Sequence, residues 1–195
     1  MVFRVERVGD TDESGCMSKF QVSFIDADKT MFVRDPMWDQ LDNKNANALS
    51  EEFLGMLRHL APTPWFVKNR AGWYGDVNII VTGRLPEHKD VTMERVYELF
   101  CEVDSLKKKW SFVSVKWDDT FPTRKESYDD YVKRKAETLV KLYHNWGVVL
   151  ADSNVSYEIR VYEDDKNVLD EMGSNQHLKQ FLMNEDGTKA MPYGE

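Results

Sequence analysis

The chain has 195 residues, of which 42% are hydrophobic and 12% aromatic, and its formal net charge is −8. This length and composition favour a single globular domain and exclude a disordered chain. Residues 1–6 lack the apolar run of a signal peptide, and no stretch approaches the roughly 20 apolar residues of a membrane span. The two cysteines are far apart and are expected to be free thiols, which is typical of a cytoplasmic protein.

Apolar runs and breaker residues predict strands that alternate with helices. Strands are expected near residues 3–8 and at 20–25, 77–83, 112–117 and 158–162. Helices are expected from Ser50 to the prolines at 62 and 64, at 92–106, at 127–146, and in a short stretch that ends at Met172. This alternation predicts an α/β fold, Rossmann-like and three-layered, with a mostly parallel central sheet.

Two carboxylates follow the expected strand at 20–25 directly. Asp26 and Asp28 are spaced D-x-D, with Thr30 two residues further on. The carboxyl ends of strands are where open α/β sheets place their chemistry. Such a pair can hold a hard dication such as Mg²⁺, or one acid can attack phosphorus while the other handles the proton. Ordinary turns also show this spacing.

Three further segments carry polar residues at informative places. Residues 82–84 (Thr-Gly-Arg) end an apolar strand, Lys133 lies near the start of a helix, and Asp164 and Asp165 follow another apolar strand. Taken singly, each has a purely structural interpretation. They would be a strand-exit turn, a surface lysine, and a helix N-cap followed by a first-turn acid.

In this order the four segments resemble the signature motifs of the haloacid dehalogenase-like (HAD) phosphohydrolase superfamily. Residues 26–30 (DADKT) match its first motif, an apolar strand followed by DxDxT. Residues 82–84 match the second motif, Lys133 the helix-borne lysine of the third, and residues 162–165 (YEDD) the paired acids of the fourth. The resemblance covers residues 20–172.

The resemblance implies a single HAD-like domain over residues 1–195, with its core at about 20–172 and a tail at 173–195. The 56 positions from Asp26 to Thr82, and the 51 from Thr82 to Lys133, leave no room for a large cap domain. A small insert at about 31–75 would line a fairly open site instead.

Two finer resemblances point toward nucleic-acid repair. Residues 123–133 look like the third-motif region of the 3′-phosphatase domain of bacteriophage polynucleotide kinase. Segments 32–38, 72–74, 82–84 and 162–164 are similar to the "Swiss army knife" RNA-repair-like HAD group. In that group an arginine usually follows Tyr-Glu-Asp, whereas Asp165 stands here and adds a possible metal ligand.

The family resemblance also implies roles for individual residues. Asp26 would be the nucleophile that forms an aspartyl-phosphate, and Asp28 the general acid and base. Thr82 would hold a phosphoryl oxygen, and Lys133 would offset the charge that grows on the transferred group. The expected magnesium ligands are Asp26, Asp28 (through its carbonyl), Asp164 and Asp165. The expected substrate contacts are Arg34, Gly83, Arg84, Arg124 and Lys125.

The expected substrate class follows from the open site and from the charge of one segment of the chain. Residues 105–141 contain ten Lys or Arg against six Asp or Glu, a local charge of +4 in an acidic chain. Such a run is usually a solvated helix face, and the alternative is a surface that meets phosphates. We therefore expect a phosphorylated nucleic-acid end, in particular a 3′ end, or a nucleotide. A small-metabolite phosphatase, and a protein of this fold that binds a partner without catalysis, stay as alternatives.

Overall fold

The computed structural model describes residues 19–36, 50–69, 76–100, 110–115, 127–153, 155–175 and 177–194. The strands are β1 (Phe20–Ile25), β2 (Val77–Thr82), β3 (Trp110–Ser114), β4 (Tyr157–Glu163), β5 (Leu178–Met183) and β6 (Ala190–Tyr193). The helices are α2 (Glu51–Arg58), α3 (Pro64–Asn69), the 3₁₀ turn η2 (Pro86–His88), α4 (Lys89–Phe100), α6 (Tyr128–Asp152) and α7 (Lys166–Met172).

The strands form one six-stranded sheet in the order β3-β2-β1-β4-β5-β6. All neighbouring strands are parallel except β6, which runs antiparallel to β5. The chain therefore adopts the predicted α/β class with a mostly parallel sheet. Because β1 is flanked by β2 on one side and β4 on the other, the connections diverge at β1, and open α/β sheets bind ligands beside such a switch point.

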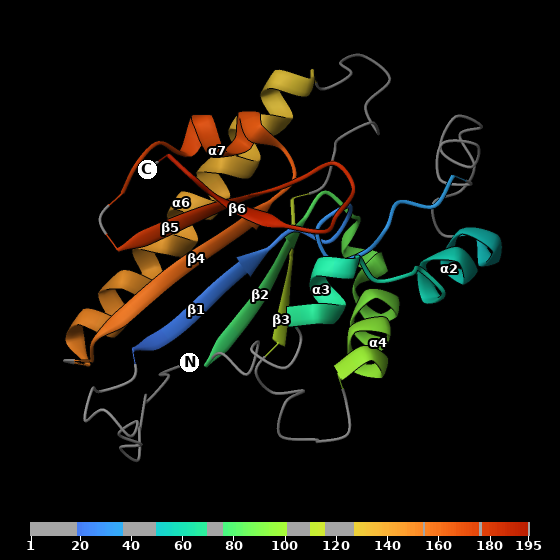
Figure 1. Ribbon diagram of the computed structural model, residues 1–195, viewed down its shortest axis with the longest axis horizontal. Helices are drawn as coiled ribbons and strands as arrows, with labels where there is room; N and C mark the ends of the chain where they lie inside the picture. The colour runs from blue at the N-terminus through green and yellow to red at the C-terminus, as the bar shows by residue number, and fades with distance from the viewer. Residues whose placement is uncertain are drawn as a thin grey trace.

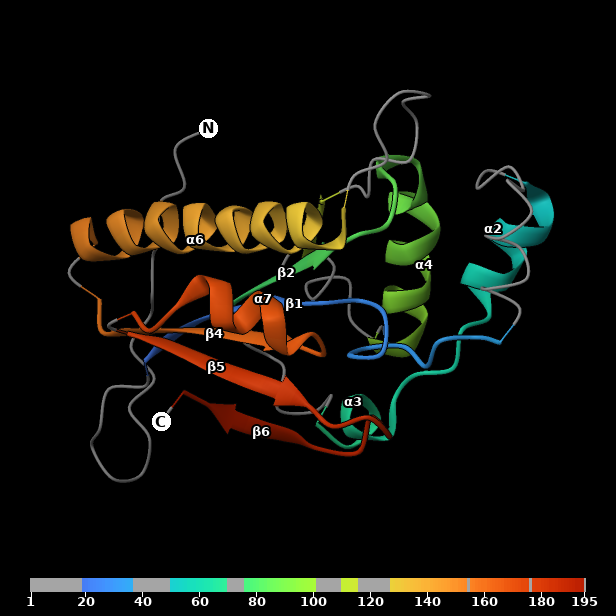
Figure 2. The same ribbon diagram turned by 90° about the horizontal axis from the view of Figure 1, so that it is seen from above.

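Apolar side chains cover one face of the central strands along their length. The other face is apolar near the carboxyl ends of the strands and polar further back, at Ser23, Asn78, Glu158 and Arg160. Phe24 belongs to a core shared with Leu139 of α6, whereas the next residue, Ile25, belongs to a second core shared with Phe66 of α3 and Val96 of α4. Figure 1 shows β1 and β2 pointing toward α3 and α4, and Figure 2 shows α6 lying along the strands on one side with α7 beside it. Helices therefore contribute to the cores on both faces of the sheet.

The longest described helix, α6, is amphipathic. Ser127 caps it by accepting a hydrogen bond from the Asp130 N–H at 3.1 Å. Its buried positions include Val132, Ala136 and Leu139, which recur at helical spacing. The helix continues to Asp152, beyond the predicted end at 146. None of the described helices is both long and apolar enough to cross a membrane.

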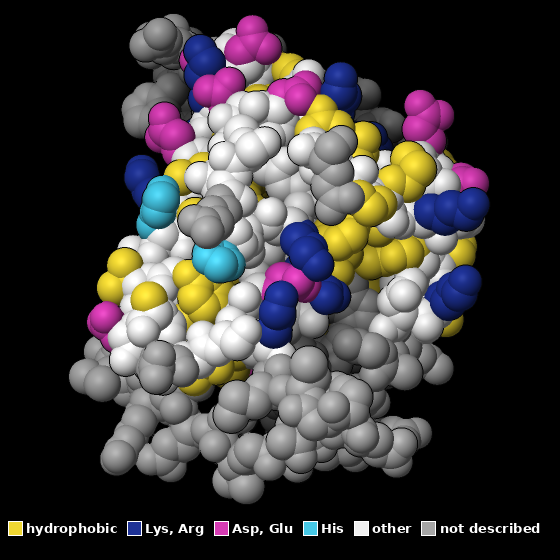
Figure 3. Space-filling view, turned by 60° about the vertical axis from the view of Figure 1, so that its left-hand side comes forward, with side chains coloured by type: hydrophobic (Ala, Val, Ile, Leu, Met, Phe, Trp, Pro, Cys, Tyr) yellow, Lys and Arg dark blue, Asp and Glu magenta, His cyan; other side chains and the backbone are white. Residues whose placement is uncertain are grey.

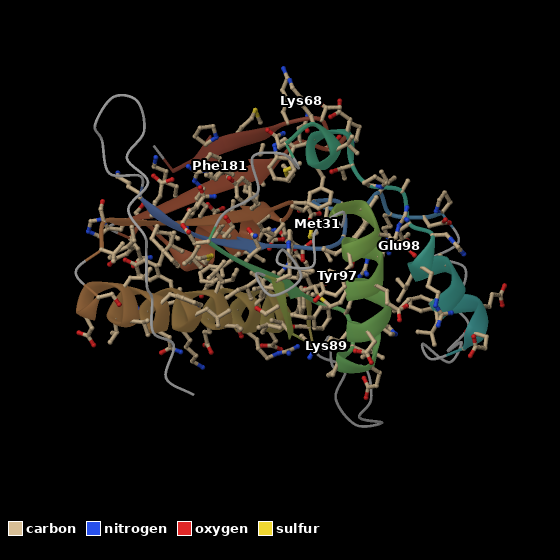
Figure 4. The ribbon with its side chains drawn as sticks, turned by 90° about the horizontal axis from the view of Figure 1, so that it is seen from below. Met31, Lys68, Lys89, Tyr97, Glu98 and Phe181 are labelled. Carbon is tan, nitrogen blue, oxygen red and sulfur yellow. The ribbon has the colours of Figure 1, made fainter. Side chains whose placement is uncertain are left out.

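The second core holds the helices between β1 and β3. Ser50 caps α2 as predicted, accepting from the Phe53 N–H at 3.2 Å. Helix α4 begins at Lys89, three residues before the predicted start. Met31, in the turn after β1, and Tyr97 of α4 belong to this core, and Figure 4 shows both near the end of β1.

Some predicted elements differ from the structure or lie outside it. The expected strand at 3–8 and the end of the helix at 101–106 are outside the described residues. Strand β3 begins at Trp110, two residues before the prediction, because the buried Trp110 pairs with Asn78 of β2.

The predicted tail at 173–195 contributes two strands, so the sheet extends beyond the expected core boundary at 172. Phe181 of β5 stacks on Tyr162 of β4 with ring centroids 4.8 Å apart. The turn between β5 and β6 reaches α3, where the Trp65 N–H donates to the Gly187 carbonyl at 2.9 Å. Gly187 has φ +65°, and an added Cβ would lie 3.0 Å from the Thr63 side chain, so glycine suits this turn.

Candidate active site

Asp26 occupies the carboxyl end of β1 at the centre of the sheet. Its N–H donates to the Tyr162 carbonyl of β4 at 2.9 Å, which extends the pairing of the two strands by one residue. The residue is only 5% exposed. An isolated carboxylate at such a depth is unfavourable, so it requires a hydrogen-bonding or charged partner.

That partner is Lys135 of α6. Its Nζ donates to Asp26 Oδ1 at 2.8 Å and also lies 2.8–3.0 Å from the Glu163 carboxylate oxygens. Burial alone would lower the pKa of Lys135, but the attraction of Asp26 and Glu163 outweighs it and raises that pKa well above its ordinary value. The lysine therefore stays a cation that ties α6 to β1 and β4.

Three carboxylates converge beside this cation. Asp26, Glu163 and Asp164 each offer an oxygen, and these oxygens lie within 4.8 Å of one another. Asp164 is the partly exposed member, and Lys29 Nζ approaches it at 3.6 Å. Three hard carboxylate oxygens at this spacing could hold a divalent cation, and Lys135 leaves part of their negative charge uncompensated.

The crowding of acids also affects protonation. Burial is the main cause that raises the pKa of Asp26 to about 7, with Lys135 opposing the shift and Asp164 and Asp28 adding to it. The pKa of Glu163 is likewise raised well above its usual range, mainly by burial. A cation that joins the group would favour the ionised forms of both acids.

Asp28 lies in the turn after β1 and faces an arginine from the neighbouring strand end. Arg84 Nη2 is 2.6 Å from Asp28 Oδ1, and Arg84 Nε is 3.1 Å from Asp28 Oδ2. Arg84 is 3% exposed and also donates to Thr92 Oγ1 at 2.8 Å. Its predicted partner was the substrate, whereas in the structure its guanidinium group holds Asp28.

The end of β2 supplies the Thr82-Gly83 turn. Thr82 is fully buried, and its Oγ1 accepts from the Arg84 N–H at 3.3 Å. A Cβ added at Gly83 would lie 2.6 Å from the Tyr131 hydroxyl, so Tyr131 can occupy this place only beside a glycine.

Tyr131 belongs to this site, although the sequence did not single it out. Its pKa is raised, first by burial and then by the charges of Asp26, Glu163 and Asp28, against the opposing effect of Lys135. The hydroxyl is therefore protonated at neutral pH and remains a hydrogen-bond donor.

Two predicted site residues occupy other places. Lys133 is exposed on α6, and the lysine that meets Asp26 is Lys135, two residues later. Two residues turn a helix by about 200°, so these side chains lie on opposite faces. Asp165 caps α7 by accepting from the Asn167 N–H at 3.0 Å and binds the Tyr128 hydroxyl at 2.5 Å. Among the described residues, Glu163 rather than Asp165 joins Asp26 and Asp164.

Three of the predicted substrate contacts are not among the residues that the structure brings together at the site. Arg34 is exposed in the segment after β1. Arg124 and Lys125 lie outside the described residues.

The spacing of the apolar residues along α6 could have identified Lys135 as the lysine that faces the sheet. Positions 132, 135, 136 and 139 form one face of α6, and the other three are the buried Val132, Ala136 and Leu139. A lysine on an otherwise apolar helix face must meet a buried acid, whereas Lys133 falls on the polar face. Comparison of the chain with protein-family models and with curated proteins finds no match in either.

Proposed function

We propose that the chain is a Mg²⁺-dependent phosphomonoesterase of the HAD type, with Asp26 as its nucleophile. The observation that carries the proposal is the contact between Asp26 and Lys135 beside Glu163 and Asp164, at the switch point of the sheet. A nucleophilic carboxylate, a fixed cation and further acids at one strand edge are the groups that phosphoryl transfer through an aspartyl-phosphate requires.

The chemistry has two steps. In the first, an Asp26 oxygen attacks phosphorus, the ester P–O bond breaks, and Asp28 gives its proton to the leaving oxygen. In the second, water attacks the phosphorus, Asp28 takes a proton from that water, and the bond between Asp26 and phosphorus breaks to release phosphate. Lys135 offsets the charge that grows on the transferred group, which is the role that the family resemblance assigns to the lysine of the third motif.

The other groups of the site hold the phosphoryl oxygens. The Thr82 hydroxyl and the Gly83 N–H are donors at the end of β2, next to the end of β1. Asp26 and Asp164, with Glu163 beside them, would hold Mg²⁺, which when bound supplies positive charge to the phosphoryl oxygens.

For the substrate we propose a phosphate on a nucleic-acid end or on a nucleotide. The described residues between Asp26 and the start of α6 form only the short helices α2 and α3, the turn η2, α4 and the two strands β2 and β3, which is consistent with an open site. Arg134 of α6 lies over the Tyr131 ring at 5.9 Å, so a basic group lies close to the site. On the face shown in Figure 3, basic and acidic side chains are interspersed, so any attraction for polyanions is expected to be local to the site.

Phosphate release from a substrate panel with Mg²⁺ tests the proposal. The panel contains 3′- and 5′-phosphorylated oligonucleotides, the matching mononucleotides and sugar phosphates, with Asp26→Asn prepared in parallel to exclude a contaminating phosphatase. We expect kcat/KM to be highest for the 3′-phosphorylated oligonucleotide and to fall as salt rises, because phosphate contacts release counterions. Equal rates on oligonucleotide and mononucleotide without salt dependence would favour a small-molecule phosphatase. No release from any member would contradict the enzymatic proposal.

A further inference from the structure

The carboxylate of Asp28 forms a bidentate contact with the guanidinium group of Arg84 rather than a single hydrogen bond. Arg84 Nη2 and Nε approach its two oxygens at 2.6 and 3.1 Å. Asp28 itself sits in a short turn, and the next residue, Lys29, has a φ of +62°. A two-point grip on a planar carboxylate sets its direction as well as its position.

Arg84 is in turn immobilised from several sides. The residue is 3% exposed, and its Nη1 donates to the hydroxyl of Thr92, a fully buried residue of α4. Its guanidinium carbon lies 5.3 Å from the centroid of the Phe32 ring. The backbone is also held, since the Arg84 carbonyl accepts from Ser114 Oγ at 2.6 Å. These contacts leave the guanidinium group little freedom to follow a substrate.

The chain of contacts from Thr92 through Arg84 to Asp28 joins three elements. Thr92 belongs to α4, Arg84 follows β2, and Asp28 follows β1, which carries the nucleophile two residues earlier. Any change in how Arg84 is held would therefore move the Asp28 carboxylate relative to Asp26. A displacement of about 1 Å of a catalytic group can lower a rate about 100-fold.

We propose that Arg84 is a positioning residue that aims Asp28 at the ester oxygen, that Thr92 holds Arg84 in this orientation, and that Arg84 does not bind the substrate phosphate. The inference rests on the proposed phosphatase function. The step it serves is the transfer of the Asp28 proton to the leaving oxygen as the ester P–O bond breaks and the bond between Asp26 and phosphorus forms.

The dependence of the rate on the leaving group tests this role. The leaving oxygen of thymidine 3′-phosphate needs a proton, whereas the 4-nitrophenolate released from 4-nitrophenyl phosphate needs little help. The parameter kcat/KM reports the steps up to cleavage of the ester bond, and the inhibition constant of inorganic phosphate reports contacts to the phosphoryl group. Both are measured for the wild type, Thr92→Val and Thr92→Ser.

We expect Thr92→Val to lower kcat/KM for thymidine 3′-phosphate about tenfold or more and that for 4-nitrophenyl phosphate less than about threefold. The inhibition constant of phosphate should stay unchanged, and Thr92→Ser, which keeps the hydroxyl, should restore the rate. Arg84→Lys keeps the positive charge but loses the two-point contact with the Asp28 carboxylate, so it should lower kcat/KM for thymidine 3′-phosphate more than that for 4-nitrophenyl phosphate. This variant provides a second test if Thr92→Val does not fold. Arg95→Lys is the matched control, because Arg95 of α4 donates to the Leu60 carbonyl and to Glu98.

Three outcomes would overturn the role. Equal losses on both esters together with a raised inhibition constant would make Arg84 a phosphate ligand. Unchanged kinetics in both Thr92→Val and Arg84→Lys would remove Arg84 from catalysis while leaving the proposed function intact. A wild-type chain that releases phosphate from neither ester would overturn the proposed function and this role together.

Discussion

Lys135 Nζ lies 2.8 Å from Asp26 Oδ1, and the two side chains are only 4% and 5% exposed. They come from residues 109 positions apart in the chain. Removing the lysine would leave Asp26 and Glu163 buried without their cation, a situation that is much less favourable than either a complete ion pair or an apolar replacement.

The first prediction separates two lysines of α6. Lys135→Met should lower the free energy of unfolding by about 3–5 kcal/mol and reduce phosphate release by about 100-fold or more. Lys133→Met, at an exposed position, should change stability by no more than about 0.5 kcal/mol and leave turnover of 4-nitrophenyl phosphate intact. Urea unfolding and steady-state kinetics check both. A greater loss of activity in Lys133→Met would return the catalytic role to Lys133.

The second prediction concerns the nucleophile. Asp26→Asn preserves the shape of the side chain but removes the attacking carboxylate, so phosphate release should fall below about one thousandth of the wild-type rate. Its circular dichroism should match that of the wild type. Asp152→Asn, at the exposed end of α6, is the control and should retain full activity. Appreciable turnover by Asp26→Asn would show that another group attacks phosphorus.

The third prediction distinguishes the adjacent acids Asp164 and Asp165. Chelation with EDTA should abolish activity, and Asp164→Asn should raise the Mg²⁺ concentration for half-activation about tenfold or more. Asp165→Ala should leave this concentration unchanged and lower stability by about 1 kcal/mol, because Asp165 caps α7. Magnesium titrations of activity, paired with thermal melts, give both values. A larger increase in the Mg²⁺ concentration for half-activation in Asp165→Ala than in Asp164→Asn would identify Asp165 as the metal ligand.

The fourth prediction follows from the pKa of Asp26, which burial above all raises from 3.8 to about 7. The folded state then binds this proton more tightly than the unfolded chain does. The resulting stabilisation is complete below about pH 4 and is lost as the pH rises through about 7. In EDTA, the free energy of unfolding should therefore fall between about pH 4 and 7 and level off above this range.

Asp26→Asn cannot ionise and should show a smaller fall over the same range. Mg²⁺ should stabilise the wild type more at the alkaline end, because it binds the ionised group. Urea unfolding across this pH range, with and without Mg²⁺, measures both effects. A stability that rises with pH in EDTA would contradict the raised pKa.

The central strands could be predicted from sequence because each is rich in β-branched and aromatic residues, either in a short run, as in β1 and β2, or alternating with polar residues, as in β4. The observed bounds of β1 match the predicted ones, and Asp26 and Thr82 lie at neighbouring strand ends as expected. The partner of Asp28 could not be predicted, because Arg84 is 56 residues away and meets it only through the pairing of β1 with β2.

Other features were missed for local reasons. Strand β5 alternates weakly between polar and apolar residues, so the tail gave little strand signal, although Asp186-Gly187 is a typical hairpin turn sequence. Glu163 is the last residue of β4 and directly follows Tyr162, so the sequence indicated a strand residue and did not predict that its carboxylate would join those of Asp26 and Asp164. Its burial depends on Lys135, which α6 brings from elsewhere in the chain.

The antiparallel strand β6 affects how readily another chain could add a strand to the sheet. It forms one edge of the sheet, and an edge strand is a template on which another chain can add its own strand. Pro192, exposed in the middle of β6 and paired in register with Phe181, has no N–H to offer such a chain. Removal of β6 would make β5, which lacks proline, the edge strand of the sheet. The unpaired N–H and C=O groups of β5 could then pair with a strand of another chain.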